Sequence, residues 1–348
     1  MFGIRRPLRR VLASGLPMVW GAVAIAYKLV CPLAQQTSLG ARLVSSAVFF
    51  AVGTGLVCHV RRALIRELRQ VRRVAGAAQS VLLRPLPPRV DGLDVAAAQL
   101  SADRGAGVGG DLYDVIAGEH GVRVVMGDVR GHGLAAPATV GALLGGFREA
   151  AHDEPDLAGV LRRLDRTLAR HLRQRAREEH PAVSGRDPDH PVAEEFVTLL
   201  LLEIARDGEV RALNCGHPWP YLISGDRVEP GCRTDPLPPL GLFPLPPDLA
   251  ATSCGPLLPG ESLVLYTDGA EDARDARGRY FSLPTALRRV ARHPTHLVPR
   301  TVVSALVRHT AGRPQDDMAL LALRNDRSPH PTSRAPASAG RAAAHRTG

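Results

Sequence analysis

The sequence predicts an α+β protein preceded by an apolar N-terminal region. Three observations support this class. From residue 92 to residue 323, short apolar runs alternate with Gly, Asp and Asn turns, a pattern typical of β-strands. Two longer stretches rich in Ala and Leu predict helices in the same part of the chain. Near the start, two apolar runs each approach the ~20 residues that a helix needs to cross a bilayer.

The composition limits the class of partner. Of 348 residues, 45% are hydrophobic and 22% charged, so the whole chain cannot be intrinsically disordered. The net charge of +10 would favour a nucleic-acid partner, but almost all basic residues are Arg and no basic motif is interleaved with aromatic residues. We therefore expect no nucleic-acid partner. A P-loop phosphotransferase is excluded because no GxxxxGK[ST] motif occurs.

The number and spacing of the cysteines indicate neither a disulfide framework nor a zinc site. They are odd in number, widely scattered and without any CxxC spacing. A reducing cytoplasm is the environment that this usage favours for the main domain. The five are Cys31, Cys58, Cys215, Cys232 and Cys254.

Residues 1–60 predict a membrane hairpin with helices at about 11–34 and 43–60. Arginines cluster before the first apolar run and after the second, with only Arg42 between the runs. Under the positive-inside rule both ends are cytoplasmic. We therefore expect a multi-pass protein of the inner or plasma membrane that contacts lipid through this hairpin and keeps its main domain in the cytoplasm. A cleaved signal peptide and a buried soluble hairpin are the alternatives.

Residues 61–83 predict an amphipathic linker helix. Its apolar positions are spaced 4, 3, 4, 3, 4, as in a heptad seam. The spacing fits a parallel homodimer stalk over residues 64–82, and it fits equally a plain linker. The positions are Leu64, Leu68, Val71, Ala75, Ala78 and Leu82.

Residues 84–324 predict the globular domain, and residues 325–348 predict a disordered tail rich in Ser, Pro, Ala and Arg. Helices are expected over Leu134–Ala151 and Leu157–Leu172. The predicted strands are Leu93–Leu100, Leu112–Ala117, Val122–Met126, Phe196–Ile204, Val210–Leu213, Ser262–Tyr266 and Met318–Leu323.

Two aspartates flank a predicted hairpin. Asp111 precedes one apolar strand and Asp128 follows the next, and the midpoint between them falls between Glu119 and His120, inside the turn. An antiparallel hairpin folded at that turn places the two carboxylates side by side.

Further aspartates occupy similar places. An apolar strand delivers Asp268 into a Gly turn, and the pair Asp316 and Asp317 opens the last strand. Each aspartate alone is explained by ordinary turn chemistry. Together they predict converging carboxylates that divalent cations would neutralise, and all-oxygen ligation favours Mg²⁺ or Mn²⁺. Two such ions activate a water molecule and neutralise phosphoryl oxygens.

These residues carry a resemblance to a known family. Seven motifs occur in the order seen in the SpoIIE-type branch of the metal-dependent (PPM, type 2C) protein serine/threonine phosphatases. The resemblance implies an αββα fold, a β-sandwich with flanking helices, and two Mn²⁺ or Mg²⁺ ions at one end. The motifs are Gly109-Gly-Asp-Leu-Tyr-Asp114, Gly127-Asp-Val-Arg-Gly-His-Gly133, Phe196-Val-Thr198, Asn214-Cys-Gly-His-Pro218, Pro239-Leu-Gly241, Leu265-Tyr-Thr-Asp-Gly269 and Asp316-Asp-Met318.

The resemblance also implies roles for the site residues. Asp128 looks like the carboxylate that bridges both ions, with the Val129 carbonyl as a supporting ligand. Asp111 looks like the acid that holds one ion mostly through water. Asp268 would be a further ligand, and Asp111, Asp128 and Asp268 would be the catalytic carboxylates.

The last acidic pair and the proton donor complete the implied site. Asp316 looks like a metal ligand, and Asp317 stands where many relatives have Asn. This branch lacks a His two residues after the bridging aspartate, and this chain has Arg130 there. His132 is the candidate proton donor; its other interpretation is a helix-entry residue between turn glycines.

The function that the resemblance implies is a membrane-tethered protein serine/threonine phosphatase in bacterial signalling. Its substrate would be a phosphoserine or phosphothreonine protein, typically an anti-sigma-factor antagonist with a STAS fold. The alternative is a catalytically silent membrane sensor that docks signalling partners. Ala319 and Asp272 depart from the usual motif, but neither departure removes an expected metal ligand.

Overall fold

The computed structural model describes part of the chain in detail. The chain divides into two units, residues 1–74 and residues 75–348, and each is described by itself. The described residues are 44, 47–48, 50–62, 65, 84–101, 110–130, 136–179 and 195–327.

The predicted multi-pass membrane localisation is wrong. Among the residues that the structure describes, no helix combines the length and the apolar character needed to span a bilayer. Within the predicted second span, described residues 44, 47–48 and 50–60 are helical, and the helix continues into the charged residues Arg61 and Arg62. The predicted lipid contact loses its support with this finding. The first predicted span, residues 11–34, lies outside the described residues.

The predicted dimer seam at residues 64–82 has only residue 65 among the described residues. The dimer therefore stays a prediction.

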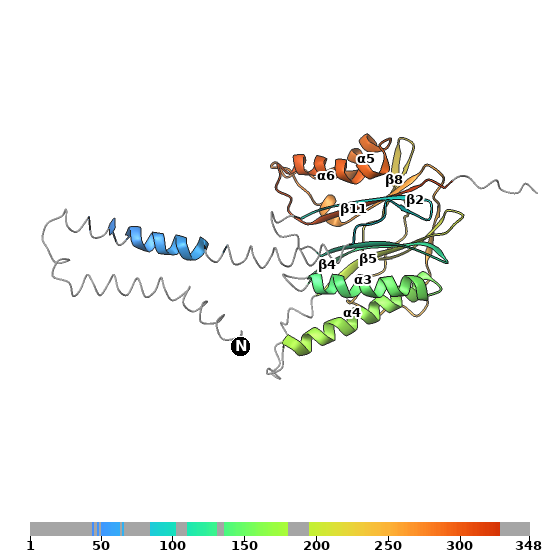
Figure 1. Cartoon of the computed structure of the whole chain (residues 1–348), viewed down its shortest axis with the longest axis horizontal. Helices are drawn as coiled ribbons and strands as arrows, with labels where there is room; N and C mark the ends of the chain where they lie inside the picture. Colours follow the sequence, from blue (N-terminus) through green and yellow to red (C-terminus); the bar gives the residue numbers. More distant parts are fainter. Residues whose placement is uncertain are drawn as a thin grey trace, which may run out of the picture. The chain divides into compact units, whose positions relative to one another are not determined.

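The second unit contains two antiparallel sheets that lie face to face between two pairs of helices (Figure 1). This architecture confirms the predicted α+β class and the sandwich. The six-stranded sheet has the order β1 (Arg89–Val90), β2 (Leu93–Leu100), β11 (Met318–Asn325), β10 (Ser262–Tyr266), β7 (Tyr221–Ser224) and β8 (Arg227–Pro230). The five-stranded sheet has the order β3 (Asp111–Gly118), β4 (Gly121–Arg130), β5 (Phe196–Ile204), β6 (Glu209–Cys215) and β9 (Thr252–Pro256).

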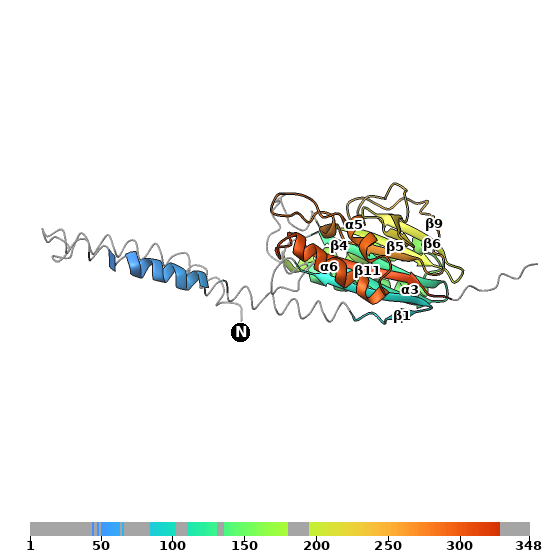
Figure 2. The same ribbon diagram turned by 90° about the horizontal axis from the view of Figure 1, so that it is seen from above.

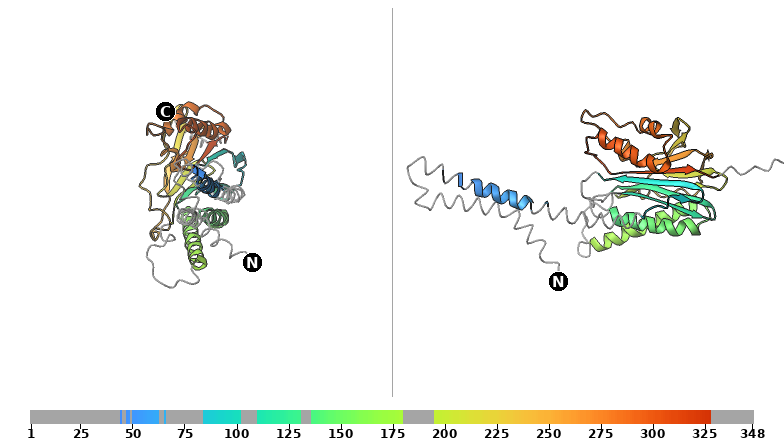
Figure 3. Two further views of the ribbon diagram at one scale, coloured as in Figure 1. Left: turned by 90° about the vertical axis from the view of Figure 1, so that its left-hand side faces the viewer. Right: turned by 45° about the horizontal axis from the view of Figure 1, so that its top comes forward.

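Each sheet is covered on its outer face by one pair of helices (Figure 3). The five-stranded sheet packs against α3 (Ala136–Asp153) and α4 (Leu157–Glu179). The six-stranded sheet packs against α5 (Leu283–Val290) and α6 (Val298–His309), and α6 lies over β11 when seen from above (Figure 2). Two short 3₁₀ turns complete the unit, η3 (Asp268–Ala270) and η4 (Thr295–Leu297).

The apolar core lies in three layers, which the alternation of side chains along the strands explains. In β4, Val124 and Met126 are fully buried between the sheets, while Val125 and Val129 face the α3–α4 layer. Both faces of β4 are therefore apolar, and its run of Val is explained. Burial of each such side chain stabilises the fold by about 1.5–3 kcal/mol.

A disulfide joins Cys232 and Cys254, contrary to the expectation from the sequence. The Cα atoms are 5.1 Å apart although 22 positions separate the residues. Cys232 follows β8 and Cys254 lies in β9, so the pair forms between edge strands of different sheets. Sequence spacing carries no sign of this proximity, because the fold alone creates it. Cys215 is buried as a free thiol.

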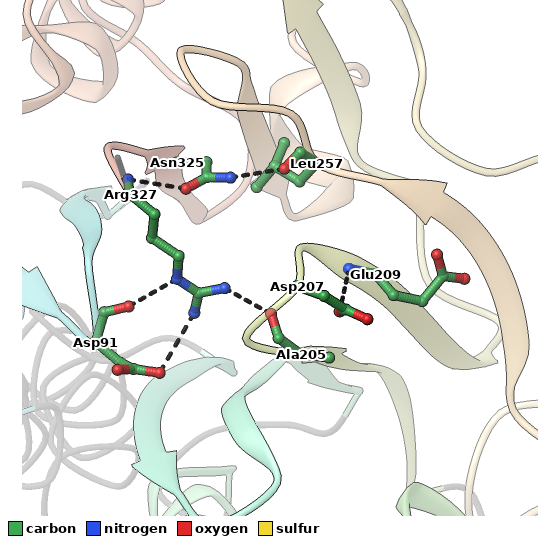
Figure 4. A network of polar contacts seen from close by, with 7 residues as sticks. All are labelled: Asp91, Ala205, Asp207, Glu209, Leu257, Asn325 and Arg327. Carbon is green, nitrogen blue, oxygen red and sulfur yellow. Dashed lines mark hydrogen bonds and ion pairs between the residues drawn. The ribbon is translucent and has the colours of Figure 1, made fainter. Parts of the chain in front are cut away.

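One end of the sandwich is closed by a polar network around Arg327 (Figure 4). Its guanidinium donates to the backbone carbonyl of Asp91 at 2.9 Å and to that of Ala205 at 2.5 Å. Asn325, the last residue of β11, donates its side-chain N–H to the Leu257 carbonyl at 2.7 Å. We call these five residues the closed end. They tie both sheets to the residues that follow β11.

Candidate active site

At the opposite end of the sandwich, the interior faces of the strands change from apolar to acidic. In β4, Asp128 follows Val124 and Met126 on the interior face. In β3, Asp111 lies on the same face as Val115, which is buried between the sheets. The alternation that builds the core therefore also directs these two carboxylates inward.

The predicted hairpin is confirmed, with the register that the sequence indicated. Residues 119–120 form the turn between β3 and β4, and Asp111 lies directly opposite Asp128. Gly121 enters β4 with φ of +108°, a conformation that favours glycine. A side chain there would also collide with the Ile204 carbonyl of β5. The tight turn therefore fixes which residues face each other.

The other sheet contributes the remaining acids. Asp268 opens the turn η3 directly after β10, and Asp316 and Asp317 directly precede β11. Gly269 packs so closely on this pair that a Cβ atom would collide with the Asp317 carbonyl. We call the end that carries Asp111, Asp128, Asp268, Asp316 and Asp317 the carboxylate end.

Thr267 links the two strands at this end and was assigned no role from the sequence. It is fully buried, and its hydroxyl accepts the Ala319 N–H at 2.9 Å while its own N–H donates to the Ala319 carbonyl at 3.1 Å. A hydrogen bond from Thr267 to Asp111 lowers the pKa of that carboxyl. The signal in the sequence is alternation, since Thr267 continues the interior face of Leu263 and Leu265.

The carboxylates interact strongly with one another. Burial raises the pKa of Asp111 well above its ordinary value, and the charges of Asp128, Asp317 and Asp268 raise it further. Burial also raises the pKa of Asp268, and the charge of Asp316 is the next cause. The carboxylate end therefore carries more negative charge than the protein neutralises.

Asp128 is the common member of these interactions. Its pKa is raised to about 7 by burial first and then by the charges of Asp268, Asp316 and Asp317. Arg130 opposes this shift. Asp128 thus lies within the electrostatic reach of both sheets, as a bridging carboxylate would.

The residues at this end fit hard divalent cations. The buried Oδ2 atom of Asp111 has no hydrogen-bond partner. At Gly110, a Cβ atom would lie 2.5 Å from Asp128 Oδ1 and would press on the Val129 carbonyl, so glycine leaves these oxygens uncovered. Within the described residues, no three Asp, Glu, His or Cys side chains form a ready-made ligand set.

Asn214 and His217 shape the neighbouring loop. The Asn214 side chain accepts the His217 N–H and donates to the His217 carbonyl, both at 2.8 Å. The imidazole Nδ1 lies 3.1 Å from the hydroxyl of Thr198, which pairs with Asp128 across β4 and β5. Burial lowers the pKa of His217 to about 3, so the ring is neutral at pH 7. His217 therefore supports the strand beside Asp128 without adding charge.

The remaining predicted site residues are Val129 and His132. Val129 is buried, and its N–H donates to the Gly110 carbonyl at 3.0 Å. Its own carbonyl lies at Gly110, beside the Asp128 carboxylate. His132 lies outside the described residues.

Comparison with known proteins agrees with this fold and site. Residues 118–326 match the family model described as Stage II sporulation protein E (SpoIIE). The match covers more than half of the chain, and the chain belongs to the SpoIIE family. This confirms the resemblance drawn from the motifs. Members of this group are metal-dependent serine/threonine phosphatases that use Mn²⁺ or Mg²⁺.

Two solved structures illustrate the likeness. The RsbU and RsbW domains of Rv1364c from Mycobacterium tuberculosis share 26% identity at a TM-score of 0.50, over 67% of this chain and 60% of that one. This chain thus corresponds to less than two thirds of that protein. The SiaA-PP2C domain of Pseudomonas aeruginosa shares 19% identity at a TM-score of 0.55, over 75% of this chain and 98% of that one. The second likeness supports the fold alone.

Proposed function

We propose that this chain is a metal-dependent phosphatase that hydrolyses phosphoserine or phosphothreonine in a protein substrate. One observation carries the proposal: carboxylates from both sheets converge at one end of the sandwich with an excess of negative charge. In a chain of the SpoIIE family, that convergence fits a phosphoryl-transfer site better than a structural role. Buried carboxylates kept for stability alone are paired with cations or hydrogen-bond donors.

The pattern of interactions supports two ion positions that share Asp128. One would use Asp128, Asp268 and Asp316, since Asp316 raises the pKa of both of the others. The second would use Asp128, Asp111 and the Val129 carbonyl, with Asp317 beside them because its charge acts on Asp111. In this proposal Asp316 belongs to the first ion position and Asp317 lies beside the second.

The chemistry divides between the ions and the chain. When bound, the ions neutralise phosphoryl oxygens and lower the pKa of water. The chain holds the carboxylates on rigid strand ends, so that water and phosphorus are oriented for in-line attack. Gly110 keeps the Asp128 oxygen uncovered, and Thr267 holds Asp111 through a hydrogen bond.

The substrate class that we propose is an anti-sigma-factor antagonist with a STAS fold. A site at the end of a sandwich, at the ends of strands, suits a phosphoserine that protrudes from a protein surface better than a buried small molecule. The motif order of the SpoIIE-type branch supports the same class, because members of that branch typically act on such antagonists.

The test is direct. We would incubate the purified full chain and Mn²⁺ with phosphorylated STAS proteins of the same genome, a generic phosphoserine peptide and an aryl phosphate, with and without chelator. Chelator-sensitive release of phosphate from a STAS protein supports the whole proposal. Hydrolysis of the peptide and the aryl phosphate alone would overturn the substrate class. No hydrolysis of any substrate would overturn the activity.

A further inference from the structure

Arg130 occupies a distinctive place beside the carboxylates. It is the last residue of β4, two positions after Asp128, and therefore lies on the same face of the strand, about 7 Å farther along it. Val129 between them is buried, whereas Arg130 is exposed. The interior face of β4 thus passes from Met126 to a carboxylate and then to a cation at the rim.

An aromatic ring holds the guanidinium there. Arg130 and Phe196 are opposite partners of β4 and β5, and the Arg130 Cζ atom lies 5.5 Å from the centre of the ring. This distance is within the range of a cation–π contact. The backbone of Phe196 lies beside Gly241, where a Cβ atom would be 3.9 Å from the Phe196 Cα. The strand that carries the ring is therefore packed at this point.

Two arginines elsewhere on the five-stranded sheet and its helices have carboxylate partners. Arg148 pairs with Asp114 at 2.7 Å, and Arg123 pairs with Glu203 at 2.9 Å. No ion pair involving Arg130 occurs among the described residues, although Asp128 is close by. The contact with Phe196 pairs the guanidinium with no carboxylate. The N–H groups of a guanidinium are the part that forms paired hydrogen bonds with phosphate oxygens.

We propose that Arg130, held by Phe196, binds the phosphoryl group of the substrate at the rim of the carboxylate end. The inference rests on the proposed phosphatase function and names a residue for recognition of the substrate. The surplus negative charge of the cluster would otherwise repel a phosphate dianion. A fixed cation at the rim offsets that repulsion and orients the ester. Phe196 acts as a positioning residue, since it would act on the substrate only through the arginine.

The test uses the full chain with Mn²⁺, an aryl phosphate as substrate and inorganic phosphate as competitive inhibitor. Arg130→Ala should raise both KM and the inhibition constant of phosphate by about tenfold or more, as expected for loss of a charge-assisted hydrogen bond. The change in kcat should be smaller. Arg130→Lys should recover part of the loss, and Phe196→Leu should give an intermediate effect because the guanidinium loses its support.

Arg206→Ala is the matched control, since Arg206 is an exposed arginine just beyond the other end of β5. It should leave both constants within twofold of the wild type. The inference is overturned if Arg130→Ala leaves both constants unchanged, or if only kcat falls. Equal melting temperatures of Arg130→Ala and wild type would show that the changed constants reflect loss of binding and not loss of structure.

Calorimetric titration of the Mn²⁺-loaded protein with inorganic phosphate tests the residue independently of turnover. Weaker phosphate binding by Arg130→Ala than by wild type supports the inference, and equal binding overturns it. A wild type that binds phosphate but hydrolyses no phosphoester would overturn the proposed function instead.

Discussion

At the closed end of the sandwich the guanidinium of Arg327 donates to three oxygens of Asp91 and Ala205, whereas at the carboxylate end Asp111 retains a buried oxygen without a partner. Both ends are built from the same strands. Hydrogen bonds satisfied within the chain stabilise the closed end. Unsatisfied carboxylates at the other end cost stability, and bound cations would recover it. The comparison separates residues that hold the fold from residues that act on a ligand.

The largest expected effect is at the carboxylate end. Asp128→Asn should lower kcat by roughly three orders of magnitude or more, because it removes the carboxylate shared by both proposed ion positions. In the presence of chelator the variant should melt at the same or a higher temperature than wild type, because the substitution removes a negative charge that the neighbouring carboxylates repel. Phosphatase assays and thermal melts check this. A purified, folded variant with full activity would disprove the assignment.

A substitution near the closed end should show the reverse behaviour. Arg123 is buried and donates to the Glu203 carboxylate, to the Ala151 carbonyl in α3 and to the carbonyls of Glu154 and Pro155 after that helix. Arg123→Ala should destabilise the fold by about 3–5 kcal/mol because Glu203 becomes a buried, unpaired charge. Denaturant unfolding measures the change.

Two results would sharpen this contrast. Arg123→Leu combined with Glu203→Leu should recover part of the stability, since no charge is then left unpaired. Activity per folded molecule should stay near that of the wild type. A large loss of kcat at full occupancy of the folded state would show that the two ends are not independent.

The pH dependence of the metal-free protein tests the excess charge. The pKa of Asp128 in the fold, about 7, is above its unfolded value of roughly 3.9, so proton binding favours the folded state. Its contribution is full below about pH 4 and is lost as pH rises through about 7. In the presence of chelator, the free energy of unfolding of the wild type should therefore fall by a few kcal/mol over that pH window relative to that of Asp128→Asn. Parallel stability curves for the two proteins would contradict this.

The smallest effect is expected at the Arg327 network itself. Arg327→Ala removes hydrogen bonds to Asp91 and Ala205 but leaves the carbonyl groups near solvent, so about 1–2 kcal/mol should be lost. KM and kcat should not change. Unfolding curves and steady-state kinetics on the same preparation check both statements, and altered kinetics would link this end to the site.

The elements that alternation and turn chemistry specify were predictable from the sequence. The strands β2, β5 and β10 begin and end at the predicted residues, and the midpoint between Asp111 and Asp128 gave the register of the hairpin. Period-two alternation is local, and a two-residue turn leaves only one pairing. The convergence of acids from both sheets followed from their positions at strand ends.

Other features depend on contacts distant in sequence. The strands β7, β8 and β9 have four or five residues each, too few to show a period, and helix α5 has only eight. The disulfide arises where two edge strands meet. The membrane prediction rested on hydropathy and flanking charge, which do not establish a continuous spanning helix, and no described helix is long and apolar enough to be one. Alternation places Thr267 on the interior face, but its hydrogen bonds to Asp111 and Ala319 depend on strands distant in sequence.

The position of the closed end has a practical consequence for handling the protein. The described residues that lead into β1 and those that follow β11 meet there, since Arg89 pairs with Asp326 at 2.5 Å. Both points lie at the opposite pole from the carboxylates. A surface linkage or a reporter introduced after Arg327 would therefore be attached at the pole opposite the carboxylate end, and an immobilised chain would keep that end open to a partner as bulky as a folded protein.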